Sequence, residues 1–363
     1  MKKYNHIDLR WKTKRIGDIL SLEYGKPLPK SERDDDGKYA VYGANGIKTR
    51  SNKFYVDQPA IIVGRKGSAG EITLTNEPFW PLDVTYFVSY DSKLYDLKFL
   101  YYFLVNQGLQ KLAKGVKPGI NRNDVYKLKV KVPPIEQQKR IVKILDDAFE
   151  KLEIAEKNTE NNLVNAKELF KSFQKRIFDD GQDRWKKRKL TEISENLDNK
   201  RIPITKRDRK KGNYPYYGAS GIVDYVNDYI FDEDLLLISE DGANLLARTY
   251  PIAFSVTGKI WVNNHAHVIR FNDKKIQLFV EYYLNYLNLE NFISGMAQPK
   301  LNQGKLNSIS IYLPPENEIQ KIINQFIDLK TNIKKIENIY QNKLIKFDEL
   351  KKSVLQKAFS GEM

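Results

Sequence analysis

Side chains suited to contacting a nucleic acid gather in two short segments that correspond to each other. Lysine and arginine pair with phosphates, and arginine, asparagine and glutamine also reach base edges in the grooves. These types occur just ahead of two long charged stretches, as Lys114, Lys117, Asn121 and Arg122 in the first segment and Gln298, Lys300, Asn302 and Gln303 in the second. We expect this pair, called the contact loops below, to make the principal contacts with a nucleic acid.

Basic residues gather at a second pair of equivalent places, earlier in each half. They are Lys26, Lys30 and Arg33 in the first half, and Lys200, Arg201, Lys206, Arg207, Arg209, Lys210 and Lys211 in the second. Contact with phosphates is a plausible interpretation of several of them. For any single residue among them, a solvated surface position is the ordinary alternative.

A third pair of segments differs in charge between the halves. Arg-Lys-Gly-Ser at 65–68 is answered by Glu-Asp-Gly-Ala at 240–243. Arginine suits guanine, whereas a carboxylate can accept from cytosine N4, so the difference is what two different half-sites would require. Candidate contacts here are Asn45, Arg65, Lys66, Ser68, Glu240, Asp241 and Asn244. Ordinary divergence of surface loops is an equally open interpretation.

The remaining motifs favour a protein without catalytic chemistry of its own. The glycine-rich segment 64–70 lacks the Gly-Lys-Ser/Thr ending that grips a nucleotide phosphate, and we expect it to be a turn near a DNA backbone. No aminomethyltransferase tetrad and no cysteine occurs. His265 and His267 have strand spacing and no ligand partners nearby in the sequence, so we expect structural histidines and no metal. We therefore expect no cofactor and no catalytic residue.

An internal repeat must position these segments. Tyr-Gly-Ala-Asn-Gly-Ile at 42–47 returns as Tyr-Gly-Ala-Ser-Gly-Ile at 217–222, and Trp11 is matched by Trp185. After a small insertion the offset becomes 181, which relates the Pro-Pro pair at 133–134 to that at 314–315. We expect the glycines of the Tyr-Gly-Ala-x-Gly-Ile turns to set the fold, because glycine permits positive φ or tight packing. The chain is a duplication.

Each half begins with a segment that mixes predicted strands and short helices, and it ends in a charged segment with a helical pattern. Apolar runs such as 60–63 and 235–238 predict strands, and 97–112 and 278–292 predict local helices, so we expect two α+β domains. Glycine and proline then become scarce, and helix formers dominate 136–178 and 318–359. We place the domain boundaries at 1–134 for the first domain, 135–180 for the first helix, 181–315 for the second domain and 316–363 for the second helix.

The two charged segments carry the clearest periodicity. A seam in alternating steps of four and three contains Ile141, Leu145, Ala148, Leu152, Ala155, Thr159, Asn162, Ala166, Leu169 and Phe173, and every position recurs 181 residues later, from Ile322 to Val354. The seams are mainly apolar but thin out at Thr159, Asn162 and Lys343. Matched heptads predict that the helices pair with each other. Because each helix leaves one domain, the pair must be antiparallel, roughly 60 Å long, and of a length to space two domains along one duplex.

Overall composition agrees with a polyanionic partner. The 363 residues carry a formal charge of +15. A membrane is the weaker alternative, because no apolar run approaches the ~20 residues of a bilayer span. Residues 1–10 include basic side chains but no apolar core of a secretory signal. We expect a cytoplasmic protein.

The sequence resembles a known family, the specificity subunits of type I restriction-modification systems. The resemblance covers nearly the whole chain and is most specific in Val-Pro-Pro-Ile-Glu-Gln-Gln-Lys-Arg-Ile-Val at 132–142 and Leu-Gln-Lys-Ala-Phe-Ser-Gly-Glu at 355–362. The start of the second helix, at 313–321, departs from the pattern of the first, because one residue more separates its Pro-Pro pair from the corresponding Glu. The first helix ends in Phe-Asp-Asp-Gly at 178–181 instead of the Ser-Gly-Glu version.

The resemblance implies a role in DNA recognition. In such complexes each domain of the specificity subunit reads one half of a bipartite, asymmetric double-stranded DNA sequence. Modification (methyltransferase) subunits methylate adenine N6, and ATP-dependent restriction subunits cleave. Alternatives are a specificity chain for a single-polypeptide enzyme, a coiled-coil interaction scaffold with basic domains, and an autonomous nuclease or methyltransferase.

Overall fold

The computed structural model of the chain describes residues 11–295 and 297–360 and divides into two compact units. The first unit joins residues 1–159 to 341–363, and the second unit spans 160–340. Each contains an α+β domain and half of a helix pair, which confirms the predicted fold class. The basic segment 1–10 and the Gly-Glu end of the C-terminal motif lie outside the described residues.

The first domain contains a four-stranded antiparallel sheet in the order β2-β8-β5-β6 and a three-stranded sheet in the order β4-β3-β7. The strands of the larger sheet are β2 (Leu20–Tyr24), β5 (Ala60–Gly64), β6 (Ile72–Thr75) and β8 (Thr85–Tyr90). Those of the smaller sheet are β3 (Tyr39–Gly43), β4 (Gly46–Ser51) and β7 (Phe79–Pro81). A ribbon of β1 (Lys12–Arg15) and β9 (Lys129–Val132) joins the two ends of the domain.

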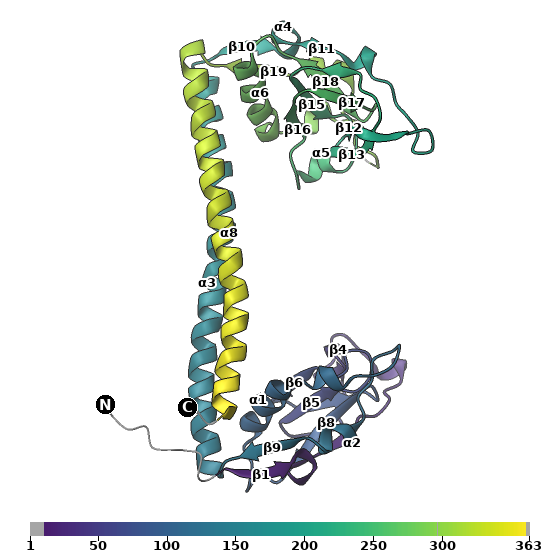
Figure 1. Cartoon of the computed structure of the whole chain (residues 1–363), viewed down its shortest axis with the longest axis vertical. Helices are drawn as coiled ribbons and strands as arrows, with labels where there is room; N and C mark the ends of the chain where they lie inside the picture. Colours follow the sequence, from purple (N-terminus) through teal and green to yellow (C-terminus); the bar gives the residue numbers. More distant parts are fainter. Residues whose placement is uncertain (1–10, 296, 361–363) are drawn as a thin grey trace, which may run out of the picture. The chain divides into compact units, whose positions relative to one another are not determined.

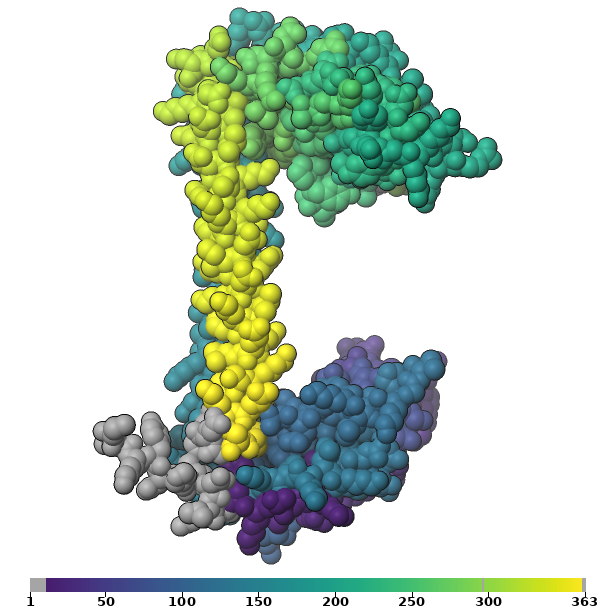
Figure 2. Space-filling model, in the orientation of Figure 1, coloured from purple at the N-terminus to yellow at the C-terminus, as the bar shows by residue number. Residues whose placement is uncertain are grey.

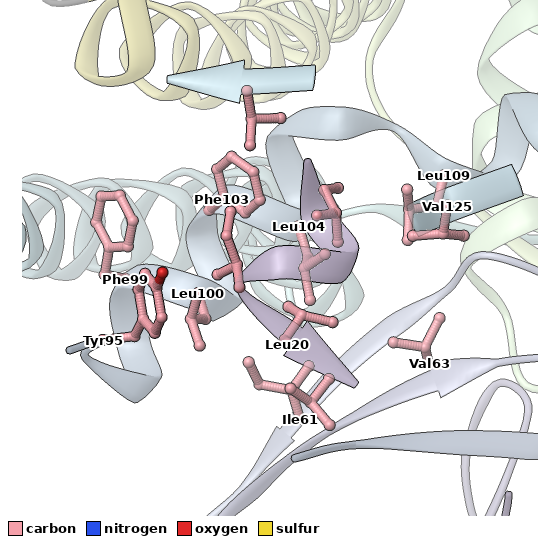
Figure 3. Packing of buried hydrophobic residues seen from close by; sticks show 14 of the residues in the cluster. Leu20, Ile61, Val63, Tyr95, Phe99, Leu100, Phe103, Leu104, Leu109 and Val125 are labelled. Atoms are coloured by element: carbon pink, nitrogen blue, oxygen red, sulfur yellow. The ribbon is translucent and has the colours of Figure 1, made fainter. Parts of the chain in front are cut away.

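One helix covers the larger sheet of the first domain. Helix α1 (Leu97–Gln107) buries Phe99, Leu100, Phe103 and Leu104, whose spacing places them on one helical face. Figure 3 shows these side chains packed toward Leu20, Ile61 and Val63 of the sheet. The remaining short helices are η2 (Ile16–Asp18), η3 (Lys30–Glu32), η4 (Leu109–Leu112) and α2 (Arg122–Tyr126).

The second domain repeats this plan. Its sheets have the orders β11-β18-β15-β16 and β13-β12-β17-β14, and a ribbon pairs β10 (Lys186–Lys189) with β19 (Ser310–Leu313). The sheet strands are β11 (Glu195–Asn196), β12 (Lys211–Gly218), β13 (Gly221–Val226), β14 (Phe231–Asp232), β15 (Leu235–Ser239), β16 (Ala253–Val256), β17 (Lys259–Val262) and β18 (Ala266–Arg270). The helices are α4 (Leu190–Ile193), η5 (Asp198–Lys200), α5 (Asn244–Ala247), α6 (Lys274–Tyr286), η6 (Glu290–Phe292) and α7 (Gln303–Asn307).

The predicted strands at 60–63 and 235–238 are confirmed as β5 and β15, whereas the predicted local helices are interrupted. Helix α1 ends at Gln107 because Gly108 adopts φ 61°, and a separate turn of 3-10 helix follows. Helix α6 begins four residues before the predicted start, at Lys274, where the side chain of Asp273 accepts from the amide of Lys275. The turn glycines Gly46 and Gly221 have φ of 106° and 117°, as expected.

Two long helices follow the domains: α3 (Ile135–Gln182) and α8 (Glu316–Ser360). Each begins directly after a Pro-Pro pair, where proline suits the first helical turn because the missing amide has no partner there. Figure 1 shows the two helices side by side. Among the described residues, no helix combines the length and apolar character of a bilayer span.

Within each unit the helices pair antiparallel, as predicted. In the first unit Leu355 and Ala358 join the core that contains Leu145, and Lys351 bonds Glu156 at 2.6 Å, so later α8 residues meet earlier α3 residues. In the second unit the fully buried ring of Phe326 meets α3 at Phe173, with ring centroids 5.5 Å apart.

In the later part of each helix, two predicted seam positions give way to the next residue, although Ala166 and Phe173 stay inward. Leu169 and its repeat mate Leu350 are 53% and 47% exposed. Their neighbours Phe170 and Lys351 take the inward place instead, and Leu163 and Leu344 similarly replace Asn162 and Lys343. A straight α-helix drifts by about 20° per heptad from a strict seven-residue repeat. Over three heptads this drift brings the next residue into the seam.

Candidate nucleic-acid interface

In the first domain, the contact loop is fastened to the end of β5 by backbone hydrogen bonds. The amide of Ile120 donates to the carbonyl oxygen of Arg65 at 2.9 Å, and the amide of Gly67 donates to Pro118 at 2.8 Å. Lys66 and Gly119 form an isolated β-bridge between these two bonds. Backbone hydrogen bonds therefore join the segment that carries Arg65 to the contact loop.

The second domain contains the same two backbone hydrogen bonds with a β-bridge between them, an arrangement called the frame below. The amide of Leu301 donates to the carbonyl oxygen of Glu240 at 2.8 Å, and the amide of Gly242 donates to Pro299 at 3.0 Å. The bridge between them pairs Asp241 with Lys300. Every one of these positions corresponds to its first-domain counterpart through the repeat offsets. The duplication thus preserves the backbone that joins two of the predicted contact segments.

Glycine is required at the corner of both frames. Gly67 has φ 84° and Gly242 has φ 108°, in the region that side chains disfavour. An added Cβ at either position would meet nothing within 4 Å, so the requirement is conformational, without any steric part. A turn that leaves open space beside its glycine can approach another molecule closely.

Asparagine begins the short helix after each contact loop. The side chain of Asn121 accepts from the amide of Asn123 at 2.9 Å, and that of Asn302 accepts from Lys305 at 3.0 Å. These caps use the carboxamide oxygen of each side chain. Within the described residues neither NH2 group has a hydrogen bond, and both asparagines are exposed.

Arginine and tyrosine form a cluster beside the first frame. The guanidinium of Arg65 lies 4.8 Å from the ring centroid of Tyr24 and 5.8 Å from that of Tyr86. Arg122 also lies over Tyr24, at 4.8 Å. The hydroxyl of Tyr86 donates to the carbonyl oxygen of Ile120 at 3.2 Å, which ties the aromatic base of the cluster to the contact loop. Cation–π stacking orients both arginines while leaving them partly exposed.

An ionic cluster occupies the same place in the second domain. Arg201 bonds Glu240 at 2.7 Å, and Lys300 reaches the same carboxylate at 3.2 Å. His267 lies 2.5 Å from Asp198 through Nδ1 and 2.7 Å from the carbonyl oxygen of Leu301 through Nε2. This imidazole therefore ties the cluster to the contact loop, as Tyr86 does in the first domain.

The two clusters correspond residue by residue. The offsets of 174, 175 and 181 relate Tyr24 to Asp198, Arg65 to Glu240, Tyr86 to His267 and Arg122 to Gln303. Even the secondary bonds match, because Arg122 donates to the Leu22 carbonyl oxygen at 3.2 Å and Gln303 donates to the Asn196 side chain at 2.8 Å. The backbone is thus shared while the side chains differ in charge, most strongly at Arg65 and Glu240, which are opposite in sign.

Burial and charge set the ionisation of the second cluster. Burial by itself would raise the pKa of Asp198, but the hydrogen bond from His267 and the amide of Val268 together hold this pKa below its ordinary value. Burial likewise opposes ionisation of Glu240, and Arg201, His267 and Lys300 hold its pKa below its ordinary value. Both carboxylates are therefore ionised at neutral pH.

The cluster of Asp198, Glu240 and His267 also has the composition of a metal site, since its possible ligand atoms lie within 4.8 Å of one another. Arg201 already compensates both carboxylates from a side chain that is only 13% exposed. Both nitrogens of His267 are engaged as well. Each of the two histidines has a carboxylate partner from a segment that is distant in the sequence, which is why the sequence did not reveal it. Asp198 is the partner of His267, and Asp241 is the partner of His265. We interpret the group as an ionic cluster that orders the loops.

Several predicted contact residues bond within the protein. Arg33 donates to the carbonyl oxygen of Leu28 at 2.8 and 3.1 Å. The side chain of Asn244 is buried and holds the following turn, donating to the carbonyl oxygen of Tyr250 at 2.9 Å. Lys114 pairs with Asp124 at 3.3 Å, although its side chain is 81% exposed. Lys26 lies 4.4 Å over the ring of Tyr55.

Other predicted residues remain open to solvent. Arg207 is 93% exposed in the segment before β12, which projects from the second domain in Figures 1 and 2. Asn45 lies exposed in the β3–β4 turn, and Ser68 is half-buried beside Gly67. Several exposed residues of the prediction have side chains without a hydrogen bond or ion pair among the described residues, among them Lys30, Lys66, Lys117, Lys200 and Gln298.

Four residues of the two clusters were not predicted as site residues from the sequence: Tyr24, Tyr86, Asp198 and His267. Neither tyrosine nor aspartate is diagnostic of a DNA contact, and the two histidines were considered only in relation to metals. The repeat offset was the available signal, because applying the offsets of 174, 175 and 181 to the positions of the first cluster leads to the second.

Comparison with known proteins agrees with this architecture. The family described as "Type I restriction modification DNA specificity domain" matches residues 9–165 and again 182–346. A putative type I restriction enzyme specificity subunit of Haemophilus influenzae is 32% identical over 202 residues, which is 51% of this chain and 51% of that protein. The Escherichia coli type I restriction enzyme EcoDI specificity subunit is 21% identical, covering 98% of this chain and 89% of its own.

Solved structures share the fold. The HsdS subunit from Thermoanaerobacter tengcongensis has a TM-score of 0.61 at 16% identity, with 100% of both chains covered. A chain from a structure of complex assembly and conformational transition of the type I R-M system has a TM-score of 0.73 at 15% identity, covering 98% of this chain and 99% of its own.

Proposed function

Because the chain belongs to the type I restriction-modification DNA specificity family, we propose that it is the sequence-reading subunit of a type I restriction-modification complex. In this proposal each domain reads one half of a bipartite, asymmetric DNA site. The chain itself is non-catalytic and holds no cofactor. Modification subunits methylate adenine N6, restriction subunits cleave with ATP, and the assembly works in the cytoplasm.

One observation carries the proposal of two separate readers. The same backbone frame occurs twice, and its side chains differ in charge where a duplex would be read: Lys66 and Arg122 in one domain, Asp241 and Gln303 in the other. Cations stacked on tyrosine can donate to guanine or to phosphate, whereas a glutamine suits adenine and a carboxylate can accept from cytosine. Two domains of one ancestry can thus prefer different bases.

We divide the predicted contact residues by where their side chains lie. Residues that are exposed, together with the half-buried Ser68, are proposed to touch DNA: Lys30, Asn45, Lys66, Ser68, Lys114, Lys117, Asn121, Lys200, Arg207, Gln298, Lys300 and Asn302. Arg65, Arg122, Asp241 and Gln303 are proposed to be base readers held by the clusters. Lys26, Arg33, Arg201, Glu240 and Asn244 are proposed to position the loops. The domain boundaries proposed for this division are 1–134 and 181–315, with 135–180 and 316–363 as spacer helices.

Gel-shift titration of the chain co-expressed with its modification subunits tests the proposal. Four duplexes are compared: the intact bipartite site, each half scrambled, and both halves scrambled. The intact site should bind on the order of 10³-fold more tightly than the doubly scrambled one at physiological salt. Each singly scrambled duplex should fall between them. Equal affinity for all four would contradict the proposal and favour an interaction scaffold with non-specific basic domains.

A further inference from the structure

The second domain has a longer connection after its central strand than the first domain. Residues 65–71 separate β5 from β6, whereas residues 240–252 separate β15 from β16, so seven residues correspond to thirteen. The difference of six is the insertion that changes the repeat offset from 175 to 181. Residues 243–251, called the wall below, contain this insertion and α5 and begin directly after Gly242, the corner of the frame.

Hydrogen bonds from two side chains hold the wall in place. The buried Asn244 accepts from the amide of Thr249 at 3.0 Å and donates to the carbonyl oxygen of Tyr250 at 2.9 Å. The guanidinium of Arg248 donates to the carbonyl oxygen of Leu287, just after α6, at 2.7 Å. Arg248 has φ 51°, which is uncommon for a residue other than glycine and is unfavourable by itself. These bonds therefore maintain a strained segment against the end of α6.

A cleft of about 730 Å³ lies between the wall, α6 and the parts of α3 and α8 that belong to the second unit. Three aromatic rings line it: Phe170 from α3, and Tyr282 and Tyr286 from α6. The ring centroids of Phe170 and Tyr282 are 6.4 Å apart, so α3 and α6 share this apolar surface. Residues 248–251 of the wall also line the cleft. The insertion therefore helps to form the cleft.

Basic side chains from both long helices line the same cleft. They are Lys167, Lys171 and Lys175 of α3, and Lys330 and Lys334 of α8. All five are exposed, and Lys167, Lys171 and Lys334 have no hydrogen bond or ion pair within the described residues, whereas Lys175 pairs with Asp179. Two carboxylates, Glu281 and Glu337, line the cleft as well, and Glu281 already accepts from the amide of Ser255 at 2.9 Å. The cleft therefore carries an excess of positive charge.

The first unit has a different charge at the equivalent positions. Through the offset of 181, Lys171 corresponds to another lysine, Lys352. The other four lysines correspond to uncharged or acidic residues: Lys167 to Asp348, Lys175 to Gln356, Lys330 to Phe149 and Lys334 to Glu153. Five positive charges thus correspond to one positive and two negative charges. A protein partner that bound both halves alike would need similar charges at both places, so the cleft suits a ligand that it meets on the second unit alone.

The lysines of α3 are spaced to follow a nucleic-acid strand. Lys167, Lys171 and Lys175 follow one another in steps of four residues, so they lie on one helical face and span about 12 Å of the helix. Phosphates along one strand of a duplex are spaced by about 3.4 Å of helix axis, so this span corresponds to three or four phosphates. A lysine binds a phosphate as a point charge and does not distinguish the bases.

Resting on the proposed function, we propose that the cleft between the wall and the two long helices binds the phosphate backbone of the DNA that adjoins the second half-site. The wall follows Gly242 directly, so DNA that is read at the frame continues beside the cleft. Lys167, Lys171 and Lys334 neutralise phosphates there. The contact strengthens binding and fixes the position of the duplex on the second domain without reading sequence.

Salt dependence of DNA binding tests the phosphate contact. The chain co-expressed with its modification subunits is titrated, at several salt concentrations, with a duplex that carries the genomic methylation motif. Lys171→Ala should lower the slope of log affinity against log salt by about 0.9, and the triple variant K167A/K171A/K334A by about 2.7. An unchanged slope in the triple variant overturns the proposal.

Two matched variants control for the loss of a positive charge as such. Lys352→Ala removes the exposed lysine at the equivalent position of the first unit, and Lys171→Arg keeps the charge in the cleft. Both should keep the slope of the unaltered complex. A loss in Lys352→Ala equal to that in Lys171→Ala would overturn the proposal. Failure of the unaltered complex to distinguish the motif from a doubly scrambled duplex contradicts the proposed function instead.

Ethylation interference locates the phosphates. Ethylation of a few consecutive phosphates next to the second half-site should block binding of the unaltered complex, and the triple variant should lose this block. Interference next to the first half-site should be the same in both. A triple variant with an unchanged pattern, or with changes next to the first half-site only, overturns the proposal.

An acidic protein segment is the alternative occupant of the cleft. Size-exclusion chromatography of the co-expressed complex distinguishes the two, because DNA plays no part in it. The triple variant should retain its modification subunits in the same proportion as the unaltered chain. Loss of these subunits from the triple variant would assign the cleft to a protein partner and overturn the proposal.

Discussion

The backbone amide of Ile120 donates to the carbonyl oxygen of Arg65 at 2.9 Å, and through this bond a loop before a short helix is fixed to the end of a central strand. The second domain repeats the bond between Leu301 and Glu240. The frame is therefore independent of the side chains at these positions. A fold that holds its loops by backbone bonds can exchange arginine for glutamate and keep its shape.

Replacing the corner glycines tests whether the frame matters for recognition. Gly67→Ala should weaken binding of the first half-site only, and Gly242→Ala that of the second, because each strains a backbone with positive φ by about 1 kcal/mol. The measurement is affinity for singly scrambled duplexes. Gly304→Ala, in α7 and without positive φ, is the control for stability and should leave the unfolding free energy equal or higher. Weakening of both half-sites by either corner variant would contradict separate frames.

Lys117→Ala tests the phosphate role of the first contact loop. Lys117 is exposed, and its side chain has no hydrogen bond or ion pair within the described residues. If it neutralises one phosphate, the variant should bind specific and scrambled duplexes less tightly by the same factor. The slope of log affinity against log salt should fall by about 0.9. Lys129→Ala, on the exposed side of β9, is the matched control. A change in base preference without a change in salt slope would assign Lys117 to base reading.

The loops of the frame were predicted from the sequence, but the side chains that support them were not. The loops around Arg65, Glu240 and the two asparagines were predicted, because exposed polar residues in a repeat are visible as a pattern. The aromatic support of Arg65 by Tyr24 comes from a strand 41 positions earlier, and only the sheet brings the two together. Similarly, Asp198 and His267 are joined by the pairing of β11 with β18, a register that no local pattern encodes.

The helix seam shows a different limit. Heptad counting identified Leu145, Leu152 and Thr159, which are buried, but it extended a strict repeat too far and chose Leu169 in place of Phe170. The physical cause is the slow drift of a real helix against the seven-residue repeat. This drift depends on how far the helices coil around each other.

Two leucines of α8 test the shifted seam. Leu355 is 8% exposed in the first core, whereas Leu350, a predicted seam position, is 47% exposed. Leu355→Ala should lower the free energy of unfolding by about 2–4 kcal/mol, and Leu350→Ala by less than about 1 kcal/mol. Chemical denaturation of the full chain provides the comparison. Equal losses in the two variants would show that the strict heptad seam was right.

Acid should loosen the second domain through its buried carboxylates. Asp198 and Glu240 have pKa values below their ordinary range in the folded protein, so each contributes stability above the unfolded pKa that is lost as the pH falls through the folded pKa. Hydrogen exchange of β15 and β18 amides should therefore accelerate on acidification below about pH 5. Asp198→Asn should exchange faster at neutral pH and depend less on acid.

Asp224→Asn is the control for this acid effect. The pKa of Asp224 is also lowered, first by the amide of Tyr225 and then by Arg209, but its carboxylate lies at the surface, where solvent screens the interaction. Its removal should leave the exchange of β15 and β18 unchanged. An acid response that Asp224→Asn reduces as strongly as Asp198→Asn would remove the buried cluster from the explanation.

The central claim is that each domain reads its own half of one DNA site. The most direct measurement is to sequence the methylated genome of cells in which the first domain, up to Val132, has been exchanged for that of another family member, with α3, the second domain and α8 unchanged. The exchange should produce a gapped methyladenine motif with one new half and one retained half. Retention of both halves, or a change in both, would contradict the claim.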